Sequence, residues 1–415
     1  MPTPITQCRI CGNSQLEPIL ELGDQKLTGV FPETAHEKIL GGPLDLVRCE
    51  PSDTGCGLLQ LRHSYPLEAM YGDNYGYRSG LNSSMVRHLE KKSGALIQLS
   101  QAKPGDLVVD IGCNDGTLLK SYPAYLERIG IDPVAKKFLN FYPPEIRVLT
   151  EFFNAEIWSR HLAGRQAQII TSIAMFYDIE RPMDFMQAIR DALAPEGIWH
   201  FEQSYMPLML EHCAYDTICH EHIEYYALRQ IQWMARRSGL KIIELKTSNT
   251  NGGSLAVTAA RSDSSHREAT ADLARLTAAE SAAGFDTMLP FQDFRDRVFR
   301  HRDALREEVA ACLKAGKTVG GYGASTKGNV LLQFCSFTPS EIPFIAEVNP
   351  EKFGHFTPGT GIPIISEAEM KLRSPEILMV LPWHFRENII ERESAFLAHG
   401  GRLLFPLPQL EYHPR

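Results

Sequence analysis

Several features that would assign a protein to a special class are absent from this sequence. No apolar run in its 415 residues approaches the roughly 18 residues that a membrane-spanning helix requires. The net charge of −8 leaves no excess of basic side chains for the phosphates of a nucleic acid. Long repeats and low-complexity tracts are missing too, and the apolar and charged fractions, 44% and 22%, are ordinary for a globular protein. We therefore expect a soluble protein that binds neither a membrane nor a nucleic acid.

The first residues lack the basic start and the apolar core of a signal peptide, so we expect a cytoplasmic protein. In that reducing compartment the nine cysteines should be thiols or metal ligands, not disulfides. Cys8-Arg-Ile-Cys11 is a C-x2-C pair followed by Gly12, which permits a tight turn, and Cys49 and Cys56 form a second, wider pair. Four thiolates make a tetrahedral structural zinc site, and a metal stabilises a small module with a thin core.

The length of the chain predicts two or three domains. Strand and helix patterns alternate from about residue 105 to 260, which is typical of a doubly wound sheet. A charged, alanine-rich stretch follows, and a new strand-to-turn unit begins at Lys317. We expect an α/β protein in four segments: a zinc-binding module at 1–75, a Rossmann-like domain at 76–262, a helical connector at 263–315 and a smaller α/β domain at 316–415.

The motif Asp110-Ile-Gly-Cys-Asn-Asp-Gly116 joins a predicted strand to a predicted helix, and Asp132 ends the next strand. This arrangement binds an adenosine ribose in open α/β sheets. Asp115 places a negative charge where the pyrophosphate of NAD would lie, and Asn114 replaces the middle glycine of the dinucleotide motif. The turn therefore favours a cationic ligand such as S-adenosylmethionine (SAM), and a Rossmann-like turn without a ligand is the alternative.

Two polar segments are candidates for chemistry. His220-Glu221-His222 follows a predicted strand, and a histidine beside a carboxylate is suited to proton abstraction. The HExxH zinc motif is excluded because Glu224 lies four residues after His220. The second segment contains Tyr75 and Tyr77, whose hydroxyls can bind sugar oxygens or a developing oxyanion. The alternatives are a polar surface loop for the first segment and an ordered linker for the second.

Together these motifs resemble the sugar 3-C-methyltransferases that act on nucleotide-linked 4-keto-6-deoxyhexoses. The resemblance covers essentially the whole chain, and the matching motifs occur in the same order: Cys8-Arg-Ile-Cys11, Asp110–Gly116, Glu151-Phe-Phe153, Glu221-His222, Gly252-Gly253, Gly321-Tyr-Gly-Ala324 and Trp383-His384.

The resemblance implies a zinc-binding N-terminal module, a Rossmann-like SAM-dependent methyltransferase domain and a C-terminal α/β domain that helps to hold the nucleotide sugar. It also implies that His222 is the general base, that Glu221 orients it, and that Tyr75 and Tyr77 line the sugar pocket. The expected SAM site, with Glu151 and Phe152 at the adenine edge, comprises Asp110, Gly112, Cys113, Asn114, Asp132, Glu151, Phe152 and Ala174.

The chain also departs from the family pattern. Cys219 and His220 stand where the family often has Tyr-Asp, and Ala174 and Asp178 align with Asn and His of several relatives. These changes concern the sugar pocket and the exact substrate more than the type of reaction.

Carbon methylation requires a carbanion equivalent, which a ketone at C4 supplies by acidifying the proton on C3. His222 would remove that proton, and the resulting enolate would attack the methyl group of SAM. The turn that begins at Gly321 offers backbone amides and a cation for a diphosphate. The expected substrate-binding residues are Tyr322, Ser325, Lys327, Lys352, Trp383, His384 and Arg386.

The sequence thus predicts C3-methylation of a dTDP- or GDP-linked 4-keto-6-deoxyhexose, in deoxysugar biosynthesis for a glycan or a natural product. Two alternatives stay open at this point: a SAM-dependent O- or N-methyltransferase acting on a sugar or small molecule, and a non-catalytic, zinc-containing scaffold that binds a nucleotide. A monomer is compatible with the sequence, which does not define the oligomeric state.

Overall fold

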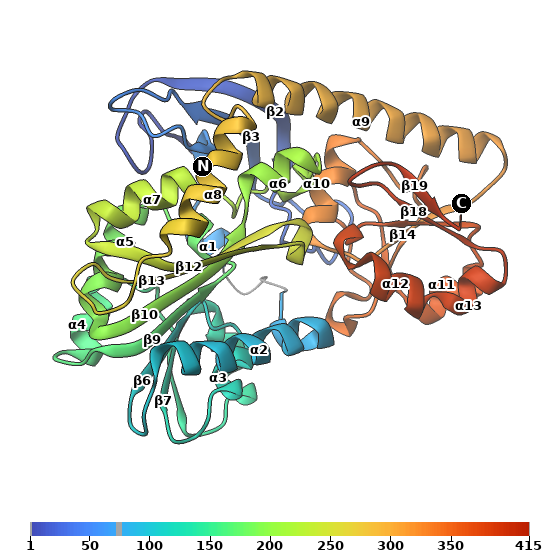
Figure 1. Cartoon of the computed structure of the whole chain (residues 1–415). Helices are drawn as coiled ribbons and strands as arrows, with labels where there is room; N and C mark the ends of the chain where they lie inside the picture. The colour runs from blue at the N-terminus through green and yellow to red at the C-terminus, as the bar shows by residue number, and fades with distance from the viewer. Residues whose placement is uncertain (1, 72–76, 415) are drawn as a thin grey trace.

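The chain is organised around three main β-sheets, which a computed structural model shows for residues 2–71 and 77–414 (Figure 1). The first is a four-stranded antiparallel sheet of the N-terminal module, in the order β11-β4-β3-β2. Its strands are β2 (Leu16–Lys26), β3 (Gly41–Cys49), β4 (Leu59–Leu61) and β11 (Glu224–Tyr225). A two-stranded sheet of β1 (Thr3–Pro4) and β5 (His63–Ser64) and the short helix α1 (Leu67–Met70) complete the module.

The second sheet has seven strands in the order β12-β13-β10-β9-β6-β7-β8, and only β13 among them runs antiparallel to its neighbours. The strand order reverses between β6 and β9, which is where open α/β sheets bind ligands. The strands are β6 (Leu107–Ile111), β7 (Glu127–Ile131), β8 (Ile146–Leu149), β9 (Ala167–Ile173), β10 (Leu193–Ser204), β12 (Leu240–Ser248) and β13 (Ser254–Arg261).

Amphipathic helices cover this sheet because their apolar residues recur at helical spacing and pack on the buried strands. Asn82 caps the first of them by accepting a hydrogen bond from the backbone amide of Ser84. The helices are α2 (Ser83–Ser100), α3 (Thr117–Ser121), α4 (Ala155–Leu162), α5 (Pro182–Ala192), α6 (Met206–Glu211) and α7 (Leu228–Arg237). The predicted Rossmann-like fold is confirmed, and strands and helices alternate between residues 105 and 260 as the sequence predicts.

The predicted helical connector forms α8 (Thr270–Ala282) and α9 (Leu289–Lys314). Figure 1 shows α9 crossing the top of the molecule from the N-terminal sheet to the C-terminal domain. The buried Arg48 of β3 fixes the start of α9, because its guanidinium donates to the carbonyls of Phe285 (2.7 Å) and Thr287 (3.0 Å) and stacks on Phe291. The connector is therefore packed against the N-terminal module.

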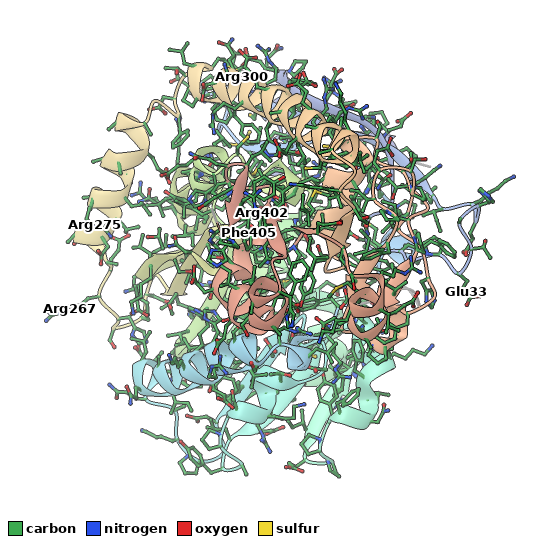
Figure 2. The ribbon with its side chains drawn as sticks, turned by 90° about the vertical axis from the view of Figure 1, so that its right-hand side faces the viewer. Glu33, Arg267, Arg275, Arg300, Arg402 and Phe405 are labelled. Carbon is green, nitrogen blue, oxygen red and sulfur yellow. The ribbon has the colours of Figure 1, made fainter. Side chains whose placement is uncertain are left out.

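The third sheet has six strands in the order β16-β15-β14-β17-β18-β19, and only β19 among them is antiparallel. Figure 2 shows this domain facing the viewer, with Arg402 and Phe405 of β18 near its centre. The strands are β14 (Val319–Tyr322), β15 (Ile345–Glu347), β16 (Ile364–Ser366), β17 (Ile377–Val380), β18 (Arg402–Phe405) and β19 (Glu411–His413). The helices are α10 (Thr326–Phe334), α11 (Glu367–Arg373), α12 (Arg386–Arg392) and α13 (Ser394–Ala398).

In residues 2–71 and 77–414, no helix combines the length and the apolar character that crossing a membrane would require.

Candidate functional site

A cavity of about 1530 Å³ lies between the carboxyl ends of the two α/β sheets. One wall is formed by the turn after β6 and by the ends of β7 and β9. The opposite wall is formed by the turn after β14 and the start of α10. This cavity exceeds the roughly 300–1,000 Å³ of an ordinary small-molecule pocket, so it has room for two ligands side by side.

The turn after β6 has the geometry that the sequence predicts for an adenosine cradle. Gly112 (φ +76°) and Asn114 (φ +50°) adopt left-handed backbone conformations, which bend the chain back over the strand end. The carboxylate of Asp132 accepts hydrogen bonds from the backbone amides of Asn114 (2.7 Å) and Val134 (2.8 Å). Since a carboxylate offers about four acceptor positions, Asp132 keeps capacity for two ribose hydroxyls on its cavity side.

Asp110 and Cys113 also lie on this wall. Thr171 donates a hydrogen bond to Asp110 (2.6 Å), and burial, aided by the charge of Asp132, raises the pKa of Asp110 to about 7. The hydroxyl of Tyr142 lies 3.1 Å from the thiol of Cys113. The expected residues of this turn, Asp110, Gly112, Cys113, Asn114 and Asp132, are thus brought together around one end of the cavity.

Asp115 does not have the role that the sequence suggested. Its carboxylate accepts from the hydroxyl (2.5 Å) and the amide of Thr117, the first residue of α3, and also from the amide of Gly80 (3.0 Å). The guanidinium of Arg78 lies 3.5 Å away. Asp115 therefore stabilises the turn from behind, and its charge does not face the cavity and cannot select a cationic ligand.

Of the two residues expected at the adenine edge, Glu151 and Phe152, only Phe152 borders the cavity. Phe152 lies on the cavity wall, partly exposed, and Ala174 lies opposite with a left-handed backbone (φ +54°). Glu151 lies outside the wall, because its carboxylate pairs with His161 (2.7 Å) and Arg160 (3.1 Å) of α4. His161 and Arg160 of the neighbouring helix hold this side chain, and the sequence pattern did not reveal these contacts.

His222 lies on the cavity wall, poised as a proton acceptor. Its Nδ1 donates to the carbonyl of Thr217 (2.9 Å), and its ring packs edge-on against Tyr177 at 4.4 Å. This bond fixes the tautomer and leaves Nε2 as the acceptor. Burial and the nearby charge of Lys327 lower the pKa of His222 to about 4, so the ring is neutral at physiological pH.

Glu221 does not orient His222, contrary to expectation. The structure assigns that role to the carbonyl of Thr217, while Oε2 of Glu221 is buried without a hydrogen-bond partner among the described residues. Thr217 could not be found from sequence, since a main-chain carbonyl carries no residue signature. Tyr75 lies outside the described residues. Tyr77 lies on the cavity wall, and its carbonyl accepts from the side-chain amide of Asn114 (3.0 Å).

The opposite wall carries cations. Ser325 caps α10 by accepting from the amide of Gly328, and Lys327 in its first turn donates to the carbonyl of Asn251 (2.9 Å). Lys352 donates to the carbonyl of Ala324 (2.7 Å), and burial lowers its pKa. Tyr322 also borders the cavity, but its hydroxyl binds Glu393 (2.8 Å) and Glu367 rather than pointing to a ligand.

The turn after β14 repeats the arrangement of the turn after β6. Glu347, at the end of β15, accepts from the amide of Ala324 (2.8 Å) and from the amides of Val348 (2.7 Å) and Asn349 (2.9 Å). Asp132 holds the first turn in the same way. Glu347 was not singled out from the sequence. The signal was available, because Glu347 ends the second strand of its domain, as Asp132 follows the second strand of the Rossmann-like domain.

Two expected substrate residues lie elsewhere. The indole of Trp383 donates to the buried Asp216 (2.8 Å), and Arg386 pairs with Glu411 (3.2 Å) and stacks on Phe405. Both border a separate cavity of about 370 Å³ and lie outside the wall of the large one. His384 borders both cavities. Trp383 thus joins the two α/β domains, whereas Arg386 is held within the C-terminal domain.

The four predicted zinc ligands come together in the N-terminal module. The sulfur atoms of Cys8, Cys11, Cys49 and Cys56 lie within 4.8 Å of one another. The pairs Cys8–Cys56 and Cys11–Cys49 are both 3.5 Å apart, near the roughly 3.8 Å between thiolates around a tetrahedral zinc ion. Gly12 and Gly57 have left-handed backbones that turn the chain after each pair. The donor set fits a structural Zn²⁺ ion with every position filled by protein.

Three family models match successive parts of the chain. They describe a zinc binding domain at residues 8–71, a methyltransferase domain at 85–245 and a C-methyltransferase C-terminal domain at 249–408. The chain is 30% identical to C-methyltransferase NovU of Streptomyces niveus over 413 residues, which cover 98% of this chain and 96% of the relative.

Two solved methyltransferase structures are similar to part of the chain. A SAM-dependent methyltransferase from Clostridium acetobutylicum is 12% identical with a TM-score of 0.33, covering 42% of this chain and 92% of its own. The CcbJ methyltransferase from Streptomyces caelestis is 12% identical with a TM-score of 0.33, covering 42% and 89%.

Metal analysis should find about one zinc ion per chain. Cys11→Ser should lose the ion and lower the thermal midpoint, because the module loses the link between its two cysteine turns. Cys312→Ser, outside the cluster, serves as the control and should keep the ion. Wild-type protein that is fully folded and free of metal would contradict the assignment.

Asp132→Asn should weaken the binding of SAM about 10–100-fold, since one or two charge-assisted hydrogen bonds are worth about 1.5–3 kcal/mol. Isothermal titration calorimetry measures this change directly. The matched control is Asp272→Asn on the exposed face of α8, which should bind as the wild type does. Equal affinities of Asp132→Asn and wild type would show that Asp132 does not hold the ribose.

Proposed function

Because this chain belongs to the C-methyltransferase family and uses SAM, we propose that it methylates C3 of a nucleotide-linked 4-keto-6-deoxyhexose. The nucleotide is dTDP or GDP, and the product serves deoxysugar biosynthesis for a glycan or a natural product. The observation that carries this proposal is the position of His222, a neutral histidine with a free Nε2 between the adenosine cradle and the cationic wall.

His222 is suited to a carbon acid. Its Nε2 accepts the C3 proton, and the electron pair of the C3–H bond moves toward the C4 oxygen to form an enolate. Burial keeps the ring free of a proton at neutral pH, although the same burial makes it a weaker base. Positioning must therefore provide much of the rate, and proximity contributes up to roughly 7–11 kcal/mol. SAM, when bound, supplies an electrophilic methyl group.

The second wall supports a nucleotide sugar as the partner. Lys327 and Lys352 place two ammonium groups by the turn after β14, and the first turn of α10 adds backbone amides. These donors match a diphosphate. His222 lies between them and the SAM cradle, so a sugar attached to that diphosphate would extend toward the methyl donor.

The D2O exchange of the C3 proton tests the role of His222. Wild-type enzyme incubated with a dTDP- or GDP-linked 4-keto-6-deoxyhexose should exchange this proton, and His222→Ala should slow exchange by about 10²–10⁴-fold, the usual contribution of general-base catalysis. His399→Ala, at the exposed end of α13, should exchange at the wild-type rate. Exchange by His222→Ala at the wild-type rate would refute the assignment.

Removing the charge of Lys327 should move the pH profile. The acid limb of kcat/KM reports the pKa of the base in the free enzyme, which for His222 is about 4. As the pH falls through that value, His222 gains a proton and activity is lost. In Lys327→Met the positive charge no longer opposes protonation, so this limb should shift to higher pH while burial keeps it below the ordinary histidine value. An unchanged or more acidic limb would contradict the coupling.

A further inference from the structure

Two carboxyl groups that the mechanism above does not use face the cavity beside His222. They belong to Glu221 and to Asp178, the last residue of the 3-10 turn Phe176–Asp178. The amide of Ile223 donates to the carbonyl of Tyr177 (3.1 Å), which holds this turn against the His222 segment. The ring of Tyr177 contacts His222. Asp178 is the next residue in the chain after Tyr177.

Both carboxyl groups have an oxygen that is shielded from water and lacks a partner in the described part of the chain. These atoms are Oδ1 of Asp178 and Oε2 of Glu221. The hydroxyl of Tyr71 hydrogen-bonds the carboxyl of Asp178. A buried carboxyl oxygen that lacks a partner is costly unless the group is neutral or a ligand satisfies it.

Glu202, which also borders the cavity, is a carboxylate whose ionised form is stabilised by its neighbours. It contacts His88 (2.9 Å) and Lys92 (2.5 Å), and although burial opposes it, these partners lower its pKa to about 2. Among the described residues, no lysine or arginine contacts Asp178 or Glu221. The charge of Lys327 instead disfavours the protonated forms of His222 and Asp216.

The state of Asp178 follows from these surroundings. Burial raises its pKa well above the ordinary range, the charge of Glu221 raises it further, and the bond from Tyr71 only partly opposes this. The other titratable groups around the pair, Cys219, Glu224, Tyr225 and the neutral His222, add no positive charge. These surroundings favour the protonated form of Asp178, in which its carboxyl group can donate a hydrogen bond.

We propose that the carboxyl group of Asp178, held beside His222 by the Tyr177–Ile223 contact, donates a hydrogen bond to the C4 oxygen of the sugar. This inference rests on the proposed function. As the C3–H bond breaks, the proton goes to Nε2 of His222, and negative charge collects on the C4 oxygen. The O–H of Asp178 stabilises that charge without transferring its proton. The C3–CH3 bond then forms as the S–CH3 bond breaks, the ketone is restored, and His222 releases its proton to solvent.

Glu221 disfavours a charge on Asp178, because two ionised carboxylates at one site repel each other. Burial raises the pKa of Glu221 as well, so a doubly charged pair is disfavoured. Lys327, at the start of α10, is less suited to the C4 oxygen, since its ammonium donates to the carbonyl of Asn251 and is assigned to the diphosphate. A neutral acid also suits this position because it does not add positive charge next to the base.

The experiment compares Asp178→Asn and Asp178→Ala by D2O exchange at C3, with saturating substrate and S-adenosylhomocysteine in the donor site. Asparagine keeps an N–H donor and alanine does not. We expect Asp178→Asn to exchange within about tenfold of wild type and Asp178→Ala to lose about 10²–10³-fold, the usual effect of removing one oxyanion donor. The apparent KM should change little in both. Asp303→Asn, on the exposed side of α9, is the control.

Each contrary outcome is distinct. Equal losses in the two variants would show that Asp178 acts as a carboxylate, and exchange by Asp178→Ala at the wild-type rate would show that it does not act. A raised KM at unchanged maximal exchange would assign it to another sugar hydroxyl. Each of these overturns the inference while leaving the proposed function intact. Failure of wild type to exchange any keto-sugar in the panel would overturn the proposed function and the Asp178 inference together.

Discussion

The backbone pairing of β11 with β4 is the constraint on which the rest of the site depends. It joins residues 224–225, directly after His222, to the sheet of the zinc module. The amide of Leu61 donates to the carbonyl of Ile223 (2.9 Å), and the amide of Ile223 donates to Tyr177. The segment that carries His222, the proposed base, is thus fixed between two sheets that belong to different parts of the chain. Cys56 lies three residues before β4, so the metal that holds this turn also supports the position of His222.

The two walls of the cavity differ in charge, and the difference suits a reaction between two unlike ligands. Asp110 and Asp132 lie in the adenosine cradle, while Lys327 and Lys352 lie across the cavity. His222 lies between the two walls. Its ring is neutral, because burial and the charge of Lys327 both lower its pKa. The repeated strand–turn–carboxylate arrangement, with Asp132 in one domain and Glu347 in the other, gives each ligand a turn of the same construction.

Much of this arrangement could be predicted from the sequence. Strand ends with a carboxylate, C-x2-C spacing and the order of motifs identified Asp132, the zinc ligands and His222, because each depends on local spacing. The predicted roles of individual side chains were wrong where the three-dimensional structure gives a side chain a different partner. Glu151 pairs with α4, Trp383 with Asp216, and Asp115 with its own helix. The hydrogen bond from His222 to Thr217 could not be predicted either, since it uses a main-chain carbonyl, which every residue has.

The most direct test of the central claim is the bond that the enzyme makes. SAM with a ¹³C-labelled methyl group should be incubated with dTDP- and GDP-linked 4-keto-6-deoxyhexoses, and the product examined by carbon NMR. The account predicts a new methyl signal with a one-bond coupling to C3 when the sugar is also labelled. A methyl group attached to oxygen or nitrogen would contradict it.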